Sequence, residues 1–494
     1  MYPAPEHLSA RAAAGYAVAA RDNEDAIRAS SVQVADDGYR GIRIAIWVYF
    51  WLLLFEGALR KWAFPGSSNM LLLVRDPVVV VCYLIALKNG KFPTDGFSVS
   101  ALILGVLSFM VSLVASQLHT MQQTVLATSF GFHANFLHLP LIALIRNSFD
   151  KEQILKFGKW TLYLAAPMAL LVFFQYRAGS EAWVNKGAGK GSSQMWIGVG
   201  DSEKIRPAGL FSYGTGLASY LSWVAAFMLN AVLVQKVLTK KMLAIAAASL
   251  AVAGTLAVSR TCALSIVLVF AGGVLCSVLA PKLATRSILI AGLCGVLYFV
   301  VSKVSVLGEG LAFLQQRVTE SEGLKVGGLD RFLDGFVEPF RALDRASFLG
   351  AGLGMGTNAV GSMLTGERAF LLGTETEWAR HILESGPVLG GLFILLRVVL
   401  FWQLISVSLA ALKRLNPLPM LLFSTCFILV LLAPIGIPMS LGFVVMSAGM
   451  AFAAAKDTVV PIGESVLMEM KPERKPVARG RSPYAERLHA GKRV

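Results

Sequence analysis

The sequence predicts an all-α polytopic membrane protein with about twelve transmembrane helices and two long extracytoplasmic loops. Hydrophobic residues make up 55% of the 494 positions and charged residues only 15%, whereas soluble proteins carry about 25% charge. The apolar residues form continuous stretches, most of them long enough to cross about 30 Å of hydrocarbon as a helix. The stretches lack period-two alternation. The sequence therefore argues against an outer-membrane barrel, a soluble enzyme and a disordered scaffold.

Twelve apolar stretches are predicted to span the membrane, and they cover residues 42–56, 69–87, 97–116, 125–145, 157–176, 209–234, 242–258, 262–280, 287–304, 379–411, 418–434 and 437–455. The stretch at 125–145 is the least apolar, because it contains His133, Asn135 and His138. The two histidines are five residues apart and so do not share a face of an α-helix. No metal site is predicted there.

Lys and Arg residues lie mostly at one end of these stretches. With a cytoplasmic N-terminus, the short outside connections hold only Arg60, Lys61 and Arg260. The short inside connections hold thirteen basic residues: Lys88, Lys91, Arg146, Lys151, Lys156, Lys159, Lys236, Lys240, Lys241, Lys282, Arg286, Lys413 and Arg414. Positive charge in short loops marks the cytoplasmic side, so both termini are predicted to be cytoplasmic.

The chain is expected to have three parts. Residues 1–40 form a cytoplasmic arm that lacks the apolar core of a cleavable signal peptide. Residues 41–455 form the transmembrane domain. Residues 456–494 form a basic cytoplasmic tail near anionic lipid heads. The net charge of +15 therefore belongs to loops and tail, and no nucleic-acid partner is expected.

Two connections are too long to be simple turns, and on this topology both lie outside the cytoplasm. They cover residues 177–208 and 305–378. The second has amphipathic, helix-compatible stretches at 311–318 and 329–343, which we expect to lie on the membrane surface. It then continues into a glycine-rich run at 350–356. The run lacks the Lys-Ser/Thr pair of a phosphate-binding loop, so ATP hydrolysis is not expected.

Cysteine spacing gives no further site. Cys82, Cys262, Cys276, Cys294 and Cys426 all lie in or beside apolar stretches, and none forms a CxxC pair. Neither a disulfide framework nor a zinc site is indicated.

Charged residues at the outer ends of the spans are candidate functional residues, because charge at membrane depth is costly unless it faces a polar cavity. Arg206 directly precedes one span, and Arg260 occupies a tight outer turn where positive charge is disfavoured. An arginine pairs with phosphate through two parallel hydrogen bonds. The alternative is structural: Arg260 reaches lipid phosphates, and Arg206 anchors a loop end.

The first outer turn reads as structural. Residues 55–62 and Arg75-Asp76-Pro77 suggest an ion-paired turn beside an interfacial tryptophan.

Residues 374–387 concentrate three carboxylates, an arginine and a histidine where the large loop meets the longest span. Such a group could supply a general base. The equally simple alternative is a charged helix start, because Glu suits the positive end of the helix dipole.

At these residues the sequence resembles the superfamily of O-antigen polymerases and O-antigen ligases, which are bacterial membrane glycosyltransferases of the GT-C type. The resemblance covers residues 40–455 and rests on the order of elements. Arg206, Gly209 and Phe211 match a family segment Arg-x-x-Gly-x-Phe before a membrane helix. Ser259-Arg260 matches a second arginine in a short outer turn.

The large loop also resembles that of the family. It ends in a glycine-rich segment, here 348–354, followed by a helix with Glu-x-Gly-x-x-Gly, here from Glu384 with the last glycine one residue late. Family members carry a histidine nine residues before that glutamate as the proposed base, and this chain has Glu375 there. Glu377 and His381 are alternative bases.

The resemblance implies glycosyl transfer on the outer face of the bacterial inner membrane, for O-antigen, capsule or exopolysaccharide. Arg206 and Arg260 would bind the pyrophosphate of an undecaprenyl-linked glycan, with support from Arg75, Arg331 and Arg380. The acceptor would be another glycan or lipid-linked saccharide. No cofactor or metal is required, and export proteins are possible partners.

Two other classes stay open. A twelve-helix transporter or flippase has the same number of spans, although no pair of corresponding broken helices is visible in the sequence. A purely structural subunit of an export complex would leave the outer arginines without a substrate.

Overall fold

The computed structural model describes residues 38–118, 125–188, 205–234, 239–283, 292, 295, 302–323, 328–365, 371–374 and 376–456. Helices are the regular elements of these residues, which include no sheet, and eight helices are long and apolar enough to cross a membrane. The protein is therefore an all-helical, multi-pass membrane protein.

The candidate membrane helices are a first helix Gly38–Ala63, α4 (Gly96–Leu118), the composite helix Val125–Ser148, α7 (Lys151–Arg177), α8 (Gly214–Val234), α10 (Arg260–Leu279), α15 (Glu377–Lys413) and α17 (Pro438–Ala455). The composite helix consists of α5 (Val125–Phe132), a π turn η3 (His133–Leu137) and α6 (Leu141–Ser148). The shorter helices include α2 (Ser68–Leu71), α3 (Asp76–Lys88), α9 (Lys240–Leu256), α12 (Ser305–Gly323), α13 (Gly328–Leu343), α14 (Asn358–Thr365) and α16 (Leu418–Leu431).

One predicted span is wrong as a continuous helix. Residues 69–87 divide into α2, a turn and the 13-residue α3. Pro77 sits in the first turn of α3, where its missing N–H costs nothing, so the sequence favours a helix start there. The predicted span at 287–304 lies almost entirely outside the described residues.

Side-chain caps fix where several helices begin. The Asp150 carboxylate accepts a bond from the Gln153 amide at 2.8 Å, and the Gln153 side chain accepts one from the Asp150 amide at 3.2 Å. This reciprocal pair satisfies amides that the first turn of α7 would leave open. Thr239 and Ser259 accept single bonds in the same way at the starts of α9 and α10.

The core is centred on α8 and α17, and α17 is buried along its whole length. Trp223 of α8 meets Phe443 of α17 edge to face, with ring centroids 4.6 Å apart. Its indole N–H donates to Ser447 at 2.7 Å, so the polar end of the ring is satisfied. Small residues such as Gly449, which lies against Ile145, let neighbouring helices approach closely.

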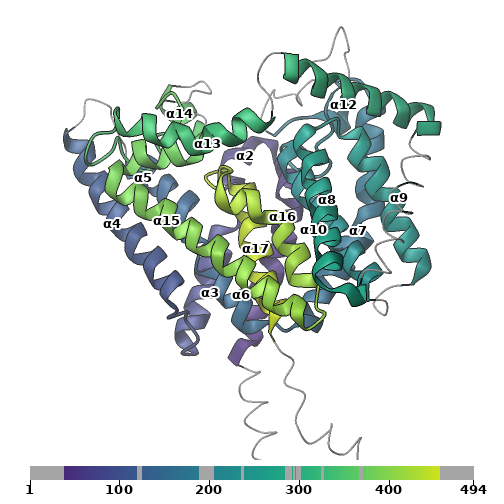
Figure 1. Ribbon diagram of the computed structural model, residues 1–494. Helices are drawn as coiled ribbons and strands as arrows, with labels where there is room; N and C mark the ends of the chain where they lie inside the picture. The colour runs from purple at the N-terminus through teal and green to yellow at the C-terminus, as the bar shows by residue number, and fades with distance from the viewer. Residues whose placement is uncertain are drawn as a thin grey trace, which may run out of the picture. The chain divides into compact units, whose positions relative to one another are not determined.

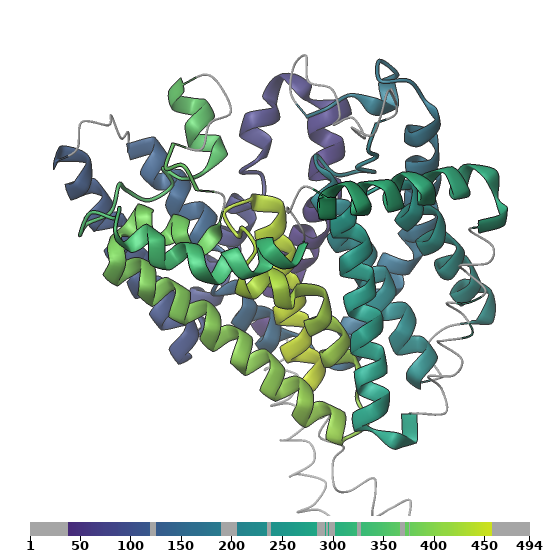
Figure 2. The same ribbon diagram turned by 45° about the horizontal axis from the view of Figure 1, so that its top comes forward.

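Two helices of the large loop, α12 and α13, run across the long helices at one end of the bundle (Figures 1 and 2). α12 packs on α9 and α10, and α13 packs on α15. Helices at both positions agree with the prediction from amphipathic pattern. At the other end, Arg43 donates to the Ser148 carbonyl at 2.6 Å and Lys456 to the Phe149 carbonyl at 3.5 Å. Both ends of the described region therefore meet the same turn.

Candidate functional site

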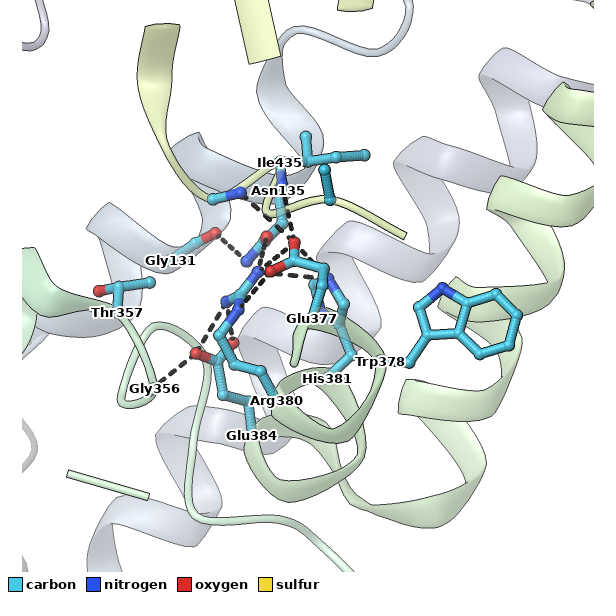
Figure 3. Close-up of polar contacts among 12 residues, drawn as sticks. Gly131, Asn135, Gly356, Thr357, Glu377, Trp378, Arg380, His381, Glu384 and Ile435 are labelled. Carbon is cyan, nitrogen blue, oxygen red and sulfur yellow. Dashed lines mark hydrogen bonds and ion pairs between the residues drawn. The ribbon is translucent and has the colours of Figure 1, made fainter. Parts of the chain in front are cut away.

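The first turns of α15 carry a group of buried charged side chains (Figure 3). Glu377, Arg380, His381 and Glu384 come from this helix, and Arg397 comes from three turns further along it. The side chains of Glu377 and Glu384 are 1% and 0% exposed. Charges at this burial are stable only when they are paired and hydrogen-bonded.

Glu377 is held from several directions. Its carboxylate lies 2.7 Å from Arg380 Nη2, 3.2 Å from His381 Nε2 and 3.4 Å from Arg397 Nη1. It also accepts a bond from the Ile435 amide at 2.9 Å, in the turn before α17. These contacts tie the start of α15 to the turn between α16 and α17.

Arg380 joins this carboxylate to a second one. Its Nη1 donates to both oxygens of Glu384 at 2.9 Å, and its Nη2 donates to Asn135 Oδ1 of η3 at 3.0 Å. Glu384 also accepts a bond from the Gly356 amide at 2.8 Å. The guanidinium thus links α15, the composite helix and the glycine-rich run.

A break in α15 explains why the glycine-rich run docks here. Gly386 has φ 76° and ψ 170°, and Pro387 has no N–H to give to the Leu383 carbonyl. The loop supplies the missing donors: Ala351 N–H bonds the Leu383 carbonyl at 2.7 Å, and Gly352 N–H bonds the Glu384 carbonyl at 2.8 Å. The predicted Glu-x-Gly motif and the glycine-rich run are therefore joined by backbone hydrogen bonds. We call this contact, of residues 350–352 with residues 383–386, the clamp.

The three candidate bases differ in what the structure describes. Glu375 lies outside the described residues. Glu377 and His381 are almost fully buried, and His381 also packs against Phe393 with ring centroids 4.0 Å apart. Both side chains are engaged within the cluster, which suits a positioning role. Their predicted part in proton transfer stays a prediction.

The two candidate phosphate-binding arginines come together. Arg206 Nη2 lies 3.5 Å from the Ser259 hydroxyl, next to Arg260. Burial, together with the positive charges of Arg317 and Arg260, lowers the pKa of Arg206 to about 10, so it stays charged at neutral pH. Within the described part of the chain, no carboxylate lies within ion-pair distance of Arg206 or Arg260.

The backbone that presents Arg260 is strained. Val258 has φ 42°, a conformation that costs a β-branched residue about 1–3 kcal/mol. Arg260 is the first residue of α10, where the helix dipole is positive and a cation is disfavoured. Strain, dipole and like charge therefore all raise the energy of this site, and an anion would relieve the last two.

The first outer turn is the ion-paired structure that the sequence predicts. Arg75 Nε donates to Glu56 at 3.0 Å, and Arg60 lies 3.5 Å from the same carboxylate. The turn also reaches the segment after Arg206, because Lys61 Nζ donates to the Gly209 carbonyl at 2.5 Å and Arg60 Nη1 to Ser212 Oγ at 3.0 Å. These contacts fix the position of the segment that follows Arg206.

Of the predicted supporting residues, Arg380 belongs to the α15 cluster and Arg75 to the first turn. Arg331 lies on α13, and its side chain lies outside the described part of the structure. Sequence reasoning did not identify Asn135 or Arg397 as partners of this cluster. Their polarity inside apolar stretches was the available signal.

Comparison of the chain with protein-family models, with curated proteins and with solved structures gives no match.

Proposed function

We propose that the protein is a glycosyltransferase of the bacterial inner membrane that polymerises or ligates undecaprenyl-pyrophosphate-linked oligosaccharide repeats. The observation that carries the proposal is the arginine cluster formed by Arg206 and Arg260, which lie next to each other at the start of α10. A pyrophosphate offers the negative charge that these guanidinium groups and the start of α10 lack, and arginine matches phosphate in two-pronged geometry.

The proposed reaction is a single displacement. An acceptor sugar hydroxyl attacks the anomeric carbon of the donor, and the bond from that carbon to the pyrophosphate oxygen breaks. The lipid pyrophosphate leaves with the electron pair, while the hydroxyl proton passes to Glu375. Arg206 and Arg260 stabilise the charge that develops on the leaving group. A single displacement of this kind inverts the anomeric configuration.

The arrangement of charges supports the proposed sidedness, with cytoplasmic termini and both long loops outside. At the end of the bundle where the described region begins and ends, burial and the nearby Arg146 and Arg43 lower the pKa of Lys456. Basic residues gathered there agree with a cytoplasmic face. The helices of the large loop lie at the opposite end.

One observation favours the alternative class of transporter or flippase. α15 is broken at Gly386-Pro387, and broken helices are common at transporter binding sites. Here, however, the freed carbonyls of Leu383 and Glu384 accept bonds from the glycine-rich run. The break is therefore better explained by docking of the glycine-rich run on α15 than by a solute-binding site. Glycosyl transfer remains our proposal.

The test is an assay of the purified, reconstituted protein with a lipid-linked oligosaccharide donor. We expect Arg206→Ala and Arg260→Ala each to lower product formation by about 10² or more, the scale of losing one transition-state donor. Arg→Lys at either position should recover little, because an ammonium lacks the fork geometry.

The matched control is Arg341→Ala. Arg341 is an exposed arginine on α13 whose contact with Glu338 lies on the surface. It should leave turnover unchanged. Normal product formation by both Arg206→Ala and Arg260→Ala would refute the pyrophosphate role. It would favour contact of the two arginines with membrane lipid instead.

A further inference from the structure

We propose that Asp76, His133 and His138 bind one divalent transition-metal ion, with Zn²⁺ as the best match to their donor atoms. The site would fasten the composite helix to the start of α3. It is distinct from the proposed glycosyl transfer, and its test does not depend on activity.

The three side chains converge from two parts of the chain. His133 Nδ1 lies 2.6 Å from one oxygen of Asp76, and His138 Nε2 lies 3.0 Å from the other. One donor atom from each residue lies within 4.8 Å of the other two. Two imidazole nitrogens and a carboxylate oxygen are a common ligand set for zinc, which often leaves a fourth position open.

The π turn η3 is what brings the two histidines together. In a regular α-helix, residues five apart point in directions that differ by about 140°. η3 covers His133–Leu137, and the wider π turn, with its i→i+5 bonding, brings His133 and His138 to the same side. The sequence argument against a metal site assumed a regular helix and therefore missed this geometry.

His133 is the observation that points to a ligand. The residue is 6% exposed, yet neither ring nitrogen makes a hydrogen bond of normal geometry in the described structure. Its Nδ1 nevertheless lies 2.6 Å from an oxygen of Asp76. Two donor atoms this close together, outside the usual hydrogen-bond geometry, fit coordination of an ion by both groups.

The charge balance also calls for a cation. Among described residues, only the two histidines lie within ion-pair distance of the Asp76 carboxylate, whose side chain is 17% exposed. The neighbouring Arg75 is engaged with Glu56. The charge of Arg75 also acts on Asp76, but among the described residues this mostly buried carboxylate has no ion pair with an arginine or lysine. Its partly exposed side chain leaves an ion a route in.

A surrounding contact would orient one ligand. His138 Nδ1 lies 2.8 Å from the Tyr49 hydroxyl, which also accepts a bond from Arg75 at 3.2 Å. With its proton on Nδ1, His138 donates to Tyr49 and turns the lone pair of Nε2 toward Asp76. Metal-binding histidines are commonly fixed by such a bond on the second nitrogen.

The experiment uses the full chain purified in detergent, stripped with a chelator, loaded with Zn²⁺ and freed of excess metal. We expect about one zinc ion per chain by mass spectrometry of the metal. His133→Gln and Asp76→Asn should each lower zinc affinity by about tenfold or more. His489→Gln, a histidine in the C-terminal tail, is the control and should retain the metal.

A second probe guards against variants that fail to fold. Co²⁺ loaded into the wild-type protein should give the intense visible absorption bands of a low-coordinate site, and Zn²⁺ should abolish them. Wild-type protein that retains no zinc, or that shows no such Co²⁺ bands, would overturn the proposal. Equal retention by a monodisperse His133→Gln variant would also overturn it, because the metal would then be bound elsewhere.

Discussion

Arg380 bridges two carboxylates of its own helix and the side-chain amide of Asn135, which comes from a distant part of the chain. Its guanidinium contacts Glu377, Glu384 and Asn135 at distances of 2.7–3.0 Å. Removing one member of a buried ion-paired group costs more than the group contributes, because the remaining charges lose their partner. The stability of the loop-to-helix junction should therefore depend on this one side chain.

We expect Arg380→Met to lower the free energy of unfolding by about 3–5 kcal/mol, since it removes the ion-pair partner of buried Glu384 and one of the partners of buried Glu377. Thermal unfolding of the purified protein in detergent measures the effect. Arg341→Met is the matched control, because Arg341 is 66% exposed and its surface contact contributes little. An Arg380→Met protein as stable as the wild type would show that the cluster is not held as described.

The candidate bases should differ in whether their substitution lowers turnover or stability. Glu375→Gln keeps size but cannot take a proton, so it should lower turnover by about 10² while the protein stays at its normal level in the membrane. Glu377→Gln removes the charge that faces Arg380 and Arg397, so it should mainly lower stability.

Single-turnover assays beside thermal unfolding separate the two effects. If Glu375→Gln were fully active and a folded His381→Ala variant inactive, the base would be His381. Full activity in all of these variants would place the base elsewhere.

At the scale of elements, the break in α15 is the feature that the clamp requires. A Cβ on Gly386 would collide with the Phe348 carbonyl, and the residue sits at φ 76°. Only glycine adopts that conformation easily. Gly350, at φ 76° as well, faces the Glu384 carbonyl from the other side of the same contact. Two glycines thus allow two backbones to touch.

Gly386→Ala should therefore destabilise the protein and lower turnover, because the glycine-rich run must move away from α15. Gly391→Ala is a matched control on the same helix, where an added Cβ meets no atom within 4 Å. It should be neutral or stabilising by about 0.5–1 kcal/mol, as for alanine in a helix interior. Limited proteolysis of the large loop, compared between the two variants, reports the displacement. Equal protection in both would argue against the clamp.

The sequence predicts well those helices that arise from one uninterrupted apolar stretch. α17 and α7 follow from the long apolar stretches at 437–455 and 157–176, although α7 begins at Lys151, before the predicted stretch. The π turn at η3 was not predictable in this way. For the break at 72–75 the sequence offers only Pro77 as a signal, and the contacts that hold the turn come from distant residues. Arg75, for example, ends the turn with bonds to Glu56 and to the Pro438 carbonyl.

For the candidate site, too, the sequence predicts the local features and misses those that depend on distant parts of the chain. The sequence located Arg206, Arg260 and the charged start of α15, because a charge beside an apolar stretch can be recognised from the linear sequence alone. It could not show that Glu377 and His381 would be enclosed, because Ile435 and Arg397 close over them from later parts of the chain. It also could not place His133 beside Asp76.

At the scale of the whole molecule, the sidedness of the bundle is the property that every site proposal needs. A cysteine introduced at Gly327 in the large loop should react with a membrane-impermeant thiol reagent in intact cells, and one at Ser482 should not. The native cysteines within the described residues, Cys82, Cys262, Cys276 and Cys426, are buried and should give little background. The reverse labelling pattern would place the arginine cluster on the cytoplasmic side.

The bond from the Ile435 amide to Glu377 also has a consequence for biosynthesis. The ribosome makes Glu377 before the turn that satisfies it, and the two residues are 58 positions apart. Until α16 and the turn after it have been synthesised, the start of α15 holds charges that are costly to leave in hydrocarbon. The nascent chain must therefore keep this segment in water or in the translocon until its last helices arrive, which makes closure of the junction a late event in membrane integration.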